Sequence, residues 1–173
     1  IIINIILVLS PVIILIRIFV NKEDKKRFIE KLCIFTKKKY KKNLIWFHGA
    51  SVGEISSVLP LVLQLENNKK IDQILITSST LSSSKIFDQF KFKKTIHQFF
   101  PIDANSFSKK FINYWKPNIA VFIDSEIWPN MFLNLKSKSI PILLLNGRIT
   151  KKSFKRWKIL GNFTKTIFQC FHK

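Results

Sequence analysis

The stretch Trp46–Glu54, WFHGASVGE, decides the fold that we expect for this chain. It begins within an apolar run, Leu44–Phe47, which is typical of a buried strand. It then turns through two glycines and a serine and ends on a carboxylate. Apolar residues recur at helical spacing from Ile55 to Leu63. The sequence therefore predicts a strand, a tight loop and a helix N-terminus, which is where ligands bind in open α/β sheets.

Glu54 allows two interpretations at this point. Ser51 and Glu54 have the Ser-x-x-Glu spacing of a capping box, in which the two side chains only complete the helix N-terminus. Alternatively, the carboxylate is a functional group at a helix N-terminus, where negative charge is favoured. The spacing is compatible with both, and the decision between them needs support from the rest of the chain.

Strand-like and helix-like segments alternate from residue 43 onward. The strand-like runs are Leu44–Phe47, Ile71–Ile76, Thr95–Phe99, Ile119–Ile123 and Ile140–Leu145. The helix-like segments are Glu54–Leu65, Ser82–Phe90, Ser106–Trp115 and Trp128–Lys136, followed by a last basic helix over Lys151–Cys170. Alternation of this kind with short loops predicts an α/β fold with a parallel, Rossmann-like sheet.

The charge balance is strongly basic, with 30 Lys and Arg against 10 Asp and Glu and a formal net charge of +20. Such a charge indicates an anionic partner: a nucleic acid, an acidic membrane surface or a phosphorylated substrate. Ile, Lys, Asn and Phe are over-used together, as codon bias in an A+T-rich genome would also produce. The charge alone therefore does not choose a partner.

Several site classes have no signature in the sequence. Cys33 and Cys170 are the two cysteines, and without a Cys-x-x-Cys pair they suggest neither a disulfide framework nor a zinc site. The three histidines lack metal-ligand spacing, so we expect no metal site. No Gly-x-Gly-x-x-Gly or Walker sequence indicates a dinucleotide or P-loop site. No RNA- or DNA-binding signature accompanies the charge.

The amino-terminal 42 residues divide into two segments of opposite character. Residues 1–20 are almost wholly apolar, and residues 21–42 are dense with lysines. We expect residues 1–20 to form a membrane anchor helix and residues 21–42 a basic juxtamembrane segment, on the cytoplasmic side and against anionic headgroups. A buried core helix followed by a solvated basic tail is the alternative. Residues 43–173 then form the Rossmann-like domain.

Polar residues follow three of the predicted strands. The hydroxyl-rich turn Thr77–Thr80 can hold a phosphate or sugar hydroxyls, although ordinary helix capping has the same appearance. Asp124 and Glu126 place two carboxylates at i and i+2 before Trp-Pro, and Glu126 could equally cap the next helix. Arg148 suits phosphate or carboxylate recognition, or a structural salt bridge to one of these two acids.

Five motifs occur in a characteristic order. They are HGASVGE at 48–54, TSST at 77–80, PID at 101–103, DSEIWPN at 124–130 and NGRIT at 146–150. In this order, each at a strand end, they resemble the amino-terminal half of the 3-deoxy-D-manno-octulosonic acid (Kdo) transferases. These enzymes add Kdo to the lipid A precursor, lipid IVA, in lipopolysaccharide synthesis.

The resemblance implies a GT-B glycosyltransferase. Its amino-terminal Rossmann-like domain would bind the lipid acceptor, and a carboxyl-terminal domain, absent from this sequence, would bind the donor substrate CMP-Kdo. We therefore expect this chain alone to be inactive. The expected location is the cytoplasmic face of the cell inner membrane, with the lipid A precursor and anionic inner-membrane lipids as partners. No cofactor and no nucleic acid are expected.

The resemblance also implies roles for individual residues. Glu54 matches the general base, which takes the proton from the acceptor hydroxyl. Asp124 and Glu126 match two carboxylates of a Glu-Thr-Glu motif, and we expect them to hold the acceptor or to stabilise the transition state. Six further residues are expected to contact substrate: Ser51, Gly53, Thr77, Ser78, Thr80 and Arg148.

The chain departs from the family pattern at three positions. Asp124 stands where the family usually has Glu, which shortens the side chain by one methylene. Ser83 replaces a glycine and Gly147 an alanine. The alternative to an enzyme is a non-catalytic, basic Rossmann-like module that docks on an anionic membrane or on nucleic acid.

Overall fold

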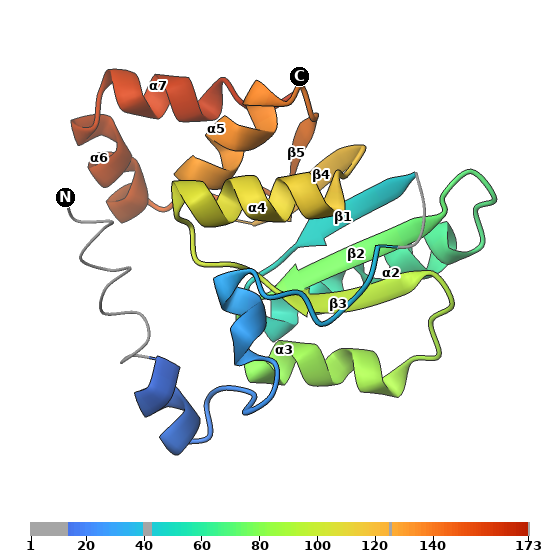
Figure 1. Ribbon diagram of the computed structural model, residues 1–173. Coiled ribbons are helices and arrows are strands. Elements are labelled where there is room, and N and C mark those ends of the chain that lie inside the picture. The colour runs from blue at the N-terminus through green and yellow to red at the C-terminus, as the bar shows by residue number, and fades with distance from the viewer. Residues whose placement is uncertain (1–13, 40–42, 125, 173) are drawn as a thin grey trace.

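A five-stranded parallel sheet forms the centre of the computed structural model, which describes residues 14–39, 43–124 and 126–172 (Figure 1). The strands are β1 (Leu44–His48), β2 (Gln73–Ser78), β3 (Thr95–Phe99), β4 (Ile119–Ile123) and β5 (Ile142–Leu145). Every neighbouring pair is parallel. The predicted α/β, Rossmann-like sheet is confirmed, with all strand ends within two residues of their expected positions.

The strand order is β3-β2-β1-β4-β5, so the direction of winding reverses between β1 and β4. His48, the last residue of β1, is in register with Thr77 of β2 and with Phe122 of β4. The carboxyl ends of these strands consequently lie along one edge of the sheet. In doubly wound sheets the crevice for ligands opens at this edge, where the winding reverses.

Helices cover both faces of the sheet (Figure 1). The helical elements are η1 (Phe28–Leu32), α2 (Val52–Glu66), α3 (Leu81–Lys85), η2 (Ile86–Gln89), α4 (Asn105–Trp115), α5 (Pro129–Ser137), α6 (Lys151–Ile159) and α7 (Asn162–Phe168). The expectation of one helix over 151–170 is wrong. The chain turns at Gly161, whose φ of +51° lies in the left-handed region that glycine adopts without a steric cost.

The alternation of side chains along β1 divides the core in two. Trp46 points to the face that α4 and α5 cover, and packs there with Phe111 and Phe122. Phe47 points to the opposite face, where Ile55 of α2 is fully buried in the second cluster. Because successive residues of a strand face opposite sides of a sheet, these two adjacent aromatic residues pack into the helix layers on the two opposite faces.

No helix among the described residues is long and apolar enough to cross a membrane. Residues 14–19 are helical. The anchor that we expected over residues 1–20 is thus not found in the described part of the chain, and its first thirteen residues lie outside that part.

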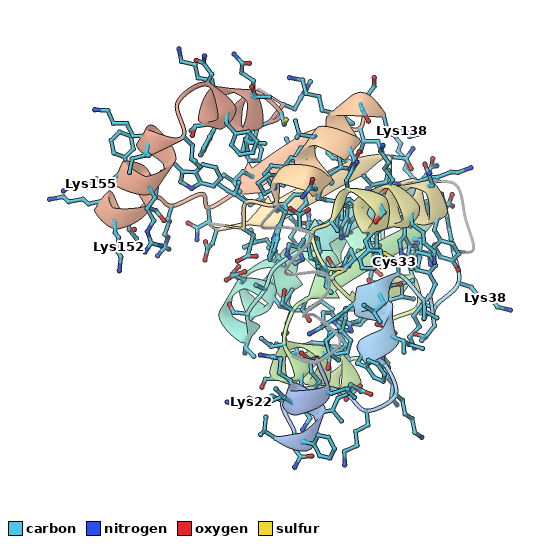
Figure 2. The ribbon with its side chains drawn as sticks, turned by 60° about the vertical axis from the view of Figure 1, so that its left-hand side comes forward. Lys22, Cys33, Lys38, Lys138, Lys152 and Lys155 are labelled. Atoms are coloured by element: carbon cyan, nitrogen blue, oxygen red, sulfur yellow. The ribbon has the colours of Figure 1, made fainter. Side chains whose placement is uncertain are left out.

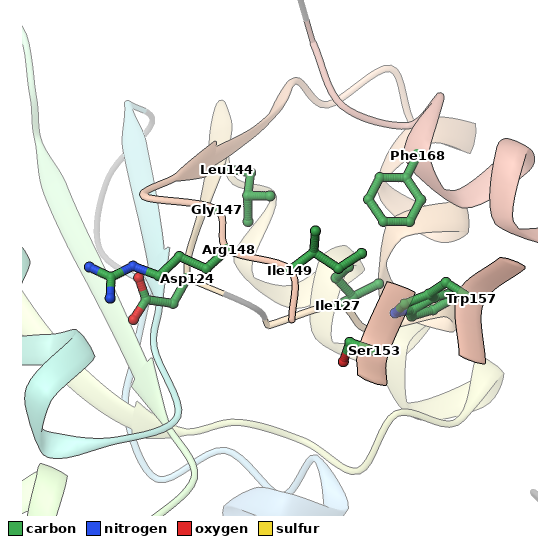
Figure 3. Close-up of a pocket in the computed structure, with 9 residues that line it drawn as sticks. All are labelled: Asp124, Ile127, Leu144, Gly147, Arg148, Ile149, Ser153, Trp157 and Phe168. Carbon is green, nitrogen blue, oxygen red and sulfur yellow. The ribbon is translucent and has the colours of Figure 1, made fainter. Parts of the chain in front are cut away.

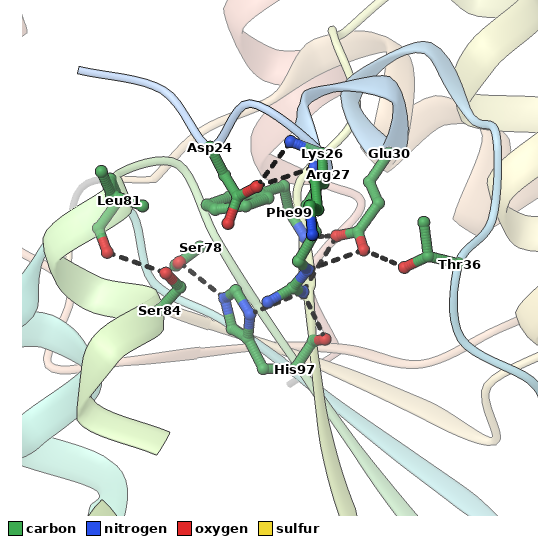
Figure 4. Close-up of polar contacts among 10 residues, drawn as sticks. All are labelled: Asp24, Lys26, Arg27, Glu30, Thr36, Ser78, Leu81, Ser84, His97 and Phe99. Atoms are coloured by element: carbon green, nitrogen blue, oxygen red, sulfur yellow. Dashed lines mark hydrogen bonds and ion pairs between the residues drawn. The ribbon is translucent and has the colours of Figure 1, made fainter. Parts of the chain in front are cut away.

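The segment before β1 packs against the sheet through buried carboxylates. Glu30 of η1 is fully buried and accepts hydrogen bonds from the Arg27 guanidinium and from the backbone N–H of Phe99 (Figure 4). Glu23, also buried, pairs with Lys31, whose Nζ also donates to a backbone carbonyl of the β2–α3 turn. The side chains of Arg27 and Lys31 are therefore held by ion pairs and hydrogen bonds within the protein. The headgroup contact expected of residues 21–42 stays a prediction, and the inward packing of Arg27 and Lys31 does not support a part for these two side chains in it.

Candidate active site

Glu54 lies half-buried in the first turn of α2, where several hydrogen bonds hold its carboxylate. Oε2 accepts from the backbone N–H of Ala50 at 2.6 Å, and Oε1 accepts from the Ser51 hydroxyl at 2.9 Å. In return, Ser51 Oγ accepts from the Glu54 backbone N–H at 3.3 Å. Ser51 is confirmed as the helix cap, whereas Glu54 accepts from the backbone N–H of the residue before the cap and not from that of Ser51 itself. This arrangement does not exclude a chemical role, because each carboxylate oxygen keeps a further lone pair.

Gly49 allows the first turn of α2 to approach the end of β4. A Cβ atom at this position would lie 3.0 Å from Glu54 Cβ and 3.2 Å from Ile123 Cδ1. The glycine therefore brings Glu54 to the place where the winding of the sheet reverses. Gly53 is exposed, and a Cβ atom there would meet nothing within 4 Å, so its contact with substrate stays a prediction.

Asp124 and Arg148 line one pocket of about 180 Å³, as Figure 3 shows. Asp124 follows β4 in the left-handed region, with φ +57°, and accepts a hydrogen bond from the Asn146 side chain after β5. The other lining residues are mostly apolar and come from the β4–α5 loop, from β5 and its following loop, and from α6 and α7: Ile127, Leu144, Gly147, Ile149, Ser153, Trp157 and Phe168. The structure thus brings a predicted carboxylate and the predicted arginine to the same apolar-walled pocket.

Glu126 lies beside two rings that the sequence analysis did not assign to the site. The Trp128 indole donates to Glu126 Oε2 at 2.9 Å. His48 Nε2 lies 3.5 Å from the same oxygen. The Glu126 side chain is 18% exposed and His48 is fully buried. His48 stands inside the quoted motif at 48–54, but nothing local in the sequence indicates that it meets a carboxylate from the β4–α5 loop.

The hydroxyl-rich stretch Thr77–Thr80 begins within β2, whose last two residues are Thr77 and Ser78, and it is mainly structural. Thr77 and Ser78 are fully buried. Thr77 Oγ1 accepts from the Trp46 indole at 2.9 Å, and Ser78 Oγ bonds His97 Nε2 at 2.8 Å (Figure 4). Thr80 caps α3 by accepting from the backbone N–H of residue 83 at 3.2 Å. The capping interpretation is confirmed for Thr80. Substrate contacts of Thr77 and Ser78 stay predictions, and the burial of both side chains does not support them.

The surroundings of His97 keep its imidazole ring neutral. The Arg27 guanidinium, which has only donors, lies 3.1 Å from Nδ1, so Nδ1 accepts and the ring proton is on Nε2, facing Ser78. Burial, and then the positive charges of Arg27 and Lys37, hold the pKa of His97 well below its usual value. This histidine therefore braces β3 as an uncharged group.

Asp103 is a further residue that the sequence analysis did not assign. Its carboxylate accepts from the backbone N–H groups of Asn130 at 3.1 Å and Met131 at 2.8 Å, at the first turn of α5. Burial raises the pKa of Asp103. The PID and DSEIWPN motifs thus meet through a helix cap, which fixes the loop that carries Glu126.

Three carboxylates and an arginine consequently come from segments that follow β1, β4 and β5 at one edge of the sheet: Glu54 in the first turn of α2, Asp124 and Glu126 after β4, and Arg148 after β5. Of these four, Asp124 and Arg148 line the pocket in Figure 3. Carboxylates can accept a proton and hold sugar hydroxyls, and an arginine can bind a phosphate. The set lies where ligands enter a doubly wound sheet and has groups suited to hydroxyl and phosphate chemistry.

Comparison with known proteins agrees with this chemistry. Residues 26–173 match the family model described as 3-deoxy-D-manno-octulosonic-acid transferase (kdotransferase). A 3-deoxy-D-manno-octulosonic acid transferase of Rickettsia bellii is 40% identical over 91% of this chain and 40% of its own length. The enzyme of the same name from Haemophilus influenzae is 30% identical over 72% of this chain and 29% of its own length. A probable mitochondrial one from Arabidopsis thaliana is 36% identical over 66% of this chain and 26% of its own length.

The chain therefore spans less than half the length of these relatives. The family model covers most of this chain, including every candidate site residue. By this match, the chain belongs to the Kdo transferase family and corresponds to the amino-terminal domain of its members.

Proposed function

We propose that this chain is the acceptor-binding domain of a glycosyltransferase that moves Kdo from CMP-Kdo to the lipid A precursor, lipid IVA. The main support is the position of the Glu54 carboxylate, which two hydrogen-bond donors hold at the point where the sheet reverses its winding. Family membership supports the same reaction. Because the chain covers 40% of the Rickettsia bellii relative, we assign the donor site to protein outside this sequence.

Glu54 is the proposed general base. As the acceptor hydroxyl oxygen attacks the anomeric carbon of Kdo, its proton moves to the Glu54 carboxylate. The new carbon–oxygen bond forms while the bond from that carbon to the CMP phosphate oxygen breaks, and CMP leaves as an anion with the bonding electrons. The donors from Ala50 and Ser51 fix the carboxylate before the reaction, so little reorganisation is needed.

The remaining polar groups are proposed to bind the acceptor. Asp124 and Glu126 accept hydrogen bonds from its sugar hydroxyls, and Arg148 faces a phosphate of the lipid. The apolar wall of the pocket in Figure 3 adjoins the fatty part of the same molecule. The reaction needs no metal or cofactor in this scheme.

Helices α6 and α7 are proposed to lie on the anionic cytoplasmic surface of the inner membrane. Lys152 and Lys155 extend outward from α6 (Figure 2). Ile159 is 83% exposed and Phe154 55% exposed on the same helix. A helix that exposes both lysines and large apolar side chains is suited to the interface of an anionic membrane.

The sharpest test of the reaction is Glu54→Gln in the full-length protein that contains this chain. The amide keeps the size of the side chain but cannot take the proton, so we expect transfer of Kdo to fall by about 10²–10⁴-fold. The assay measures labelled Kdo in the lipid product, and circular dichroism checks the fold. Ser83→Ala, at the same position of α3 as Glu54 in α2, is the matched control and should keep its activity. A Glu54→Gln enzyme with near-normal transfer would refute the base assignment.

A non-catalytic docking module is the second candidate, and the net charge of +20 favours it. Vesicle binding separates the two. An acceptor-binding domain should prefer vesicles with lipid A precursor over phosphatidylglycerol vesicles of equal charge, because its pocket recognises the sugar. Equal binding to both vesicles would indicate a general anionic docking module.

A further inference from the structure

Six residues other than glycine have a positive φ among the described residues, and two of them stand apart. Four lie at the ends of helices, where a left-handed residue commonly closes the last turn: Asn21, Cys33, Lys116 and Ser139. The other two, Asp124 and Asn146, directly follow the strands β4 and β5, with φ angles of +57° and +54°. Because these two residues follow strands, helix capping does not account for their conformation.

Asp124 and Asn146 occupy matching places on neighbouring strands. Ile123 and Leu145 are the last pair in register between β4 and β5, and Asp124 and Asn146 each come next in the chain. The backbone N–H of Asp124 donates to the Leu145 carbonyl at 2.9 Å, which extends the pairing of the two strands by one step. Both strands therefore end in a left-handed residue at the same level of the sheet, and the two short side chains meet there.

The contact between the two side chains has a defined direction. The Asn146 amide nitrogen donates to Asp124 Oδ1. A carboxylate only accepts hydrogen bonds, so the NH₂ end of the amide, and not its oxygen, must face it. Asn and Asp are also the residue types that enter the left-handed region most readily after glycine. This pair of residue types therefore suits both the backbone turns and the contact between them.

Gly147 allows the loop after β5 to stay close to the end of β4. A Cβ atom at this position would lie 2.6 Å from Leu144 Cδ2 and 3.9 Å from the backbone oxygen of Asp124. The next residue, Arg148, lines the same pocket as Asp124 (Figure 3). Three consecutive residues of this loop consequently bear on the pocket: the first bonds Asp124, the second permits the close approach, and the third lines the wall.

We propose that Asn146 is a positioning residue: its side-chain amide holds the Asp124 carboxylate in the pocket of Figure 3, so that the carboxylate can accept a hydrogen bond from a sugar hydroxyl of the lipid acceptor. A carboxylate has about four acceptor positions, and the bond to Asn146 occupies one of them. Asn146 acts through Asp124, and we assign it no contact with substrate. The hydrogen bond is independent of the reaction, whereas its effect on acceptor binding rests on the proposed function.

Side-chain amide NMR of asparagine-labelled full-length protein tests the contact directly. The NH₂ signal that disappears in Asn146→Gly identifies the residue. Because a hydrogen bond to a carboxylate shifts one of the two amide protons more than the other, their resonances should be well separated in the wild-type protein. The separation should shrink in Asp124→Gly, which keeps the left-handed turn without a steric cost. An Asn146 signal that Asp124→Gly leaves unchanged would overturn the proposal.

Steady-state kinetics of two glycine variants test the consequence. Asn146→Gly removes the amide and keeps the turn, because glycine adopts the left-handed region freely. We expect the KM for the lipid acceptor to rise about tenfold, the scale of one hydrogen bond to a charged group, while the KM for CMP-Kdo stays unchanged. Ser139→Gly, at an exposed left-handed position after α5, is the matched control and should change neither constant. If Asn146→Gly leaves both KM values unchanged or raises them together, the amide is merely structural and the positioning role is refuted.

Two double variants separate the amide from the carboxylate. In Asp124→Gly, which has no carboxylate to hold, the addition of Asn146→Gly should raise the acceptor KM no further. The exchange Asp124→Asn/Asn146→Asp keeps an amide–carboxylate bond between the strand ends but moves the carboxylate to the loop after β5. Its melting temperature should stay near that of the wild type while its acceptor KM stays raised. Additive effects in the first double variant, or a normal acceptor KM in the second, would overturn the proposal.

The two kinds of measurement also distinguish this proposal from the proposed function. If the wild-type full-length protein transfers no Kdo, the proposed function fails and the role of Asn146 in acceptor binding fails with it. The NMR result still decides in that case whether Asn146 holds the Asp124 carboxylate.

Discussion

Two strand-to-helix corners at the same edge of the sheet have nearly the same local structure and different chemistry. In the β1–α2 corner, Ser51 caps the helix by accepting from Glu54; in the β2–α3 corner, Thr80 does the same with Ser83. The first corner lies where the winding reverses and ends on a partly exposed carboxylate. The second ends on a buried hydroxyl. A capping motif therefore does not identify a site, whereas its place in the strand order does.

Different segments supply the hydrogen bonds around the two corners. Around the β2–α3 corner, the segment before β1 meets polar groups of β3, where Arg27 donates to the His97 carbonyl and Glu30 accepts from the Phe99 N–H (Figure 4). Lys31 donates to the Ser79 carbonyl of the turn. At the β1–β4 crevice, a buried nitrogen of His48 has no hydrogen bond among the described residues. The side-chain amide of Gln98 in β3 is buried without a hydrogen bond as well, so an unpaired polar atom alone does not mark a site.

The largest expected effect on stability lies next to the β2–α3 corner, where the segment before β1 packs against β3. Glu30→Ala would leave the Arg27 guanidinium and the Phe99 N–H without their buried acceptor, and should lower the free energy of unfolding by about 3–5 kcal/mol. Urea denaturation measures this. Asp88→Ala, at an exposed position of η2, is the control and should cost much less. A small loss for Glu30→Ala would mean that this corner is not braced as described.

A second expectation concerns acid. The pKa of His97 in the folded chain lies well below its value of 6.5 in the unfolded chain. Below pH 6.5, the unfolded chain therefore binds a proton at this residue that the folded chain does not bind. The free energy of unfolding should therefore fall as pH drops from about 6.5 toward the folded pKa, by up to about 1.4 kcal/mol per pH unit. Denaturation of wild type and His97→Gln at several pH values checks this. The variant should show a shallower slope, and equal slopes would contradict the buried neutral state.

The smallest effects distinguish the two caps. Ser51→Ala and Thr80→Ala should each lower the free energy of unfolding by about 1 kcal/mol, because each removes one helix cap. Only Ser51→Ala also frees the Glu54 carboxylate, so in the full-length enzyme it should slow Kdo transfer about tenfold, which corresponds to about 1.4 kcal/mol. Thermal melts and transfer rates are measured on both variants. Equal rates in the two would remove the functional difference between the corners.

Much of the fold could be predicted because its signals are local. Apolar runs such as Leu44–Phe47 are short, dense and bounded by turn residues, and the helix caps at Ser51 and Thr80 follow a three-residue spacing. The break at Gly161 was missed because residues compatible with a helix continue on both sides of this single glycine. The two short helices differ in direction, which the residue pattern around one glycine does not reveal.

Only part of the candidate site could be predicted from the sequence, for a related reason. Polar residues at strand ends were visible in the sequence, but strand order decides which of them face the crevice. Thr77 and Ser78 looked equivalent to Ser51 before their burial was known. The role of Asp103 as the cap of α5 depends on a contact between two loops that are distant in the sequence.

The sequence by itself determined the alternation of strands and helices, the capping pairs and the family, because each depends on neighbouring residues or on motifs in a fixed order. The tertiary structure decided which side chains meet. The inward packing of Arg27 and Lys31, the joint pocket of Asp124 and Arg148 and the approach of His48 to its carboxylate all join distant segments. Such contacts arise when parallel strands align their carboxyl ends, and no local pattern encodes that alignment.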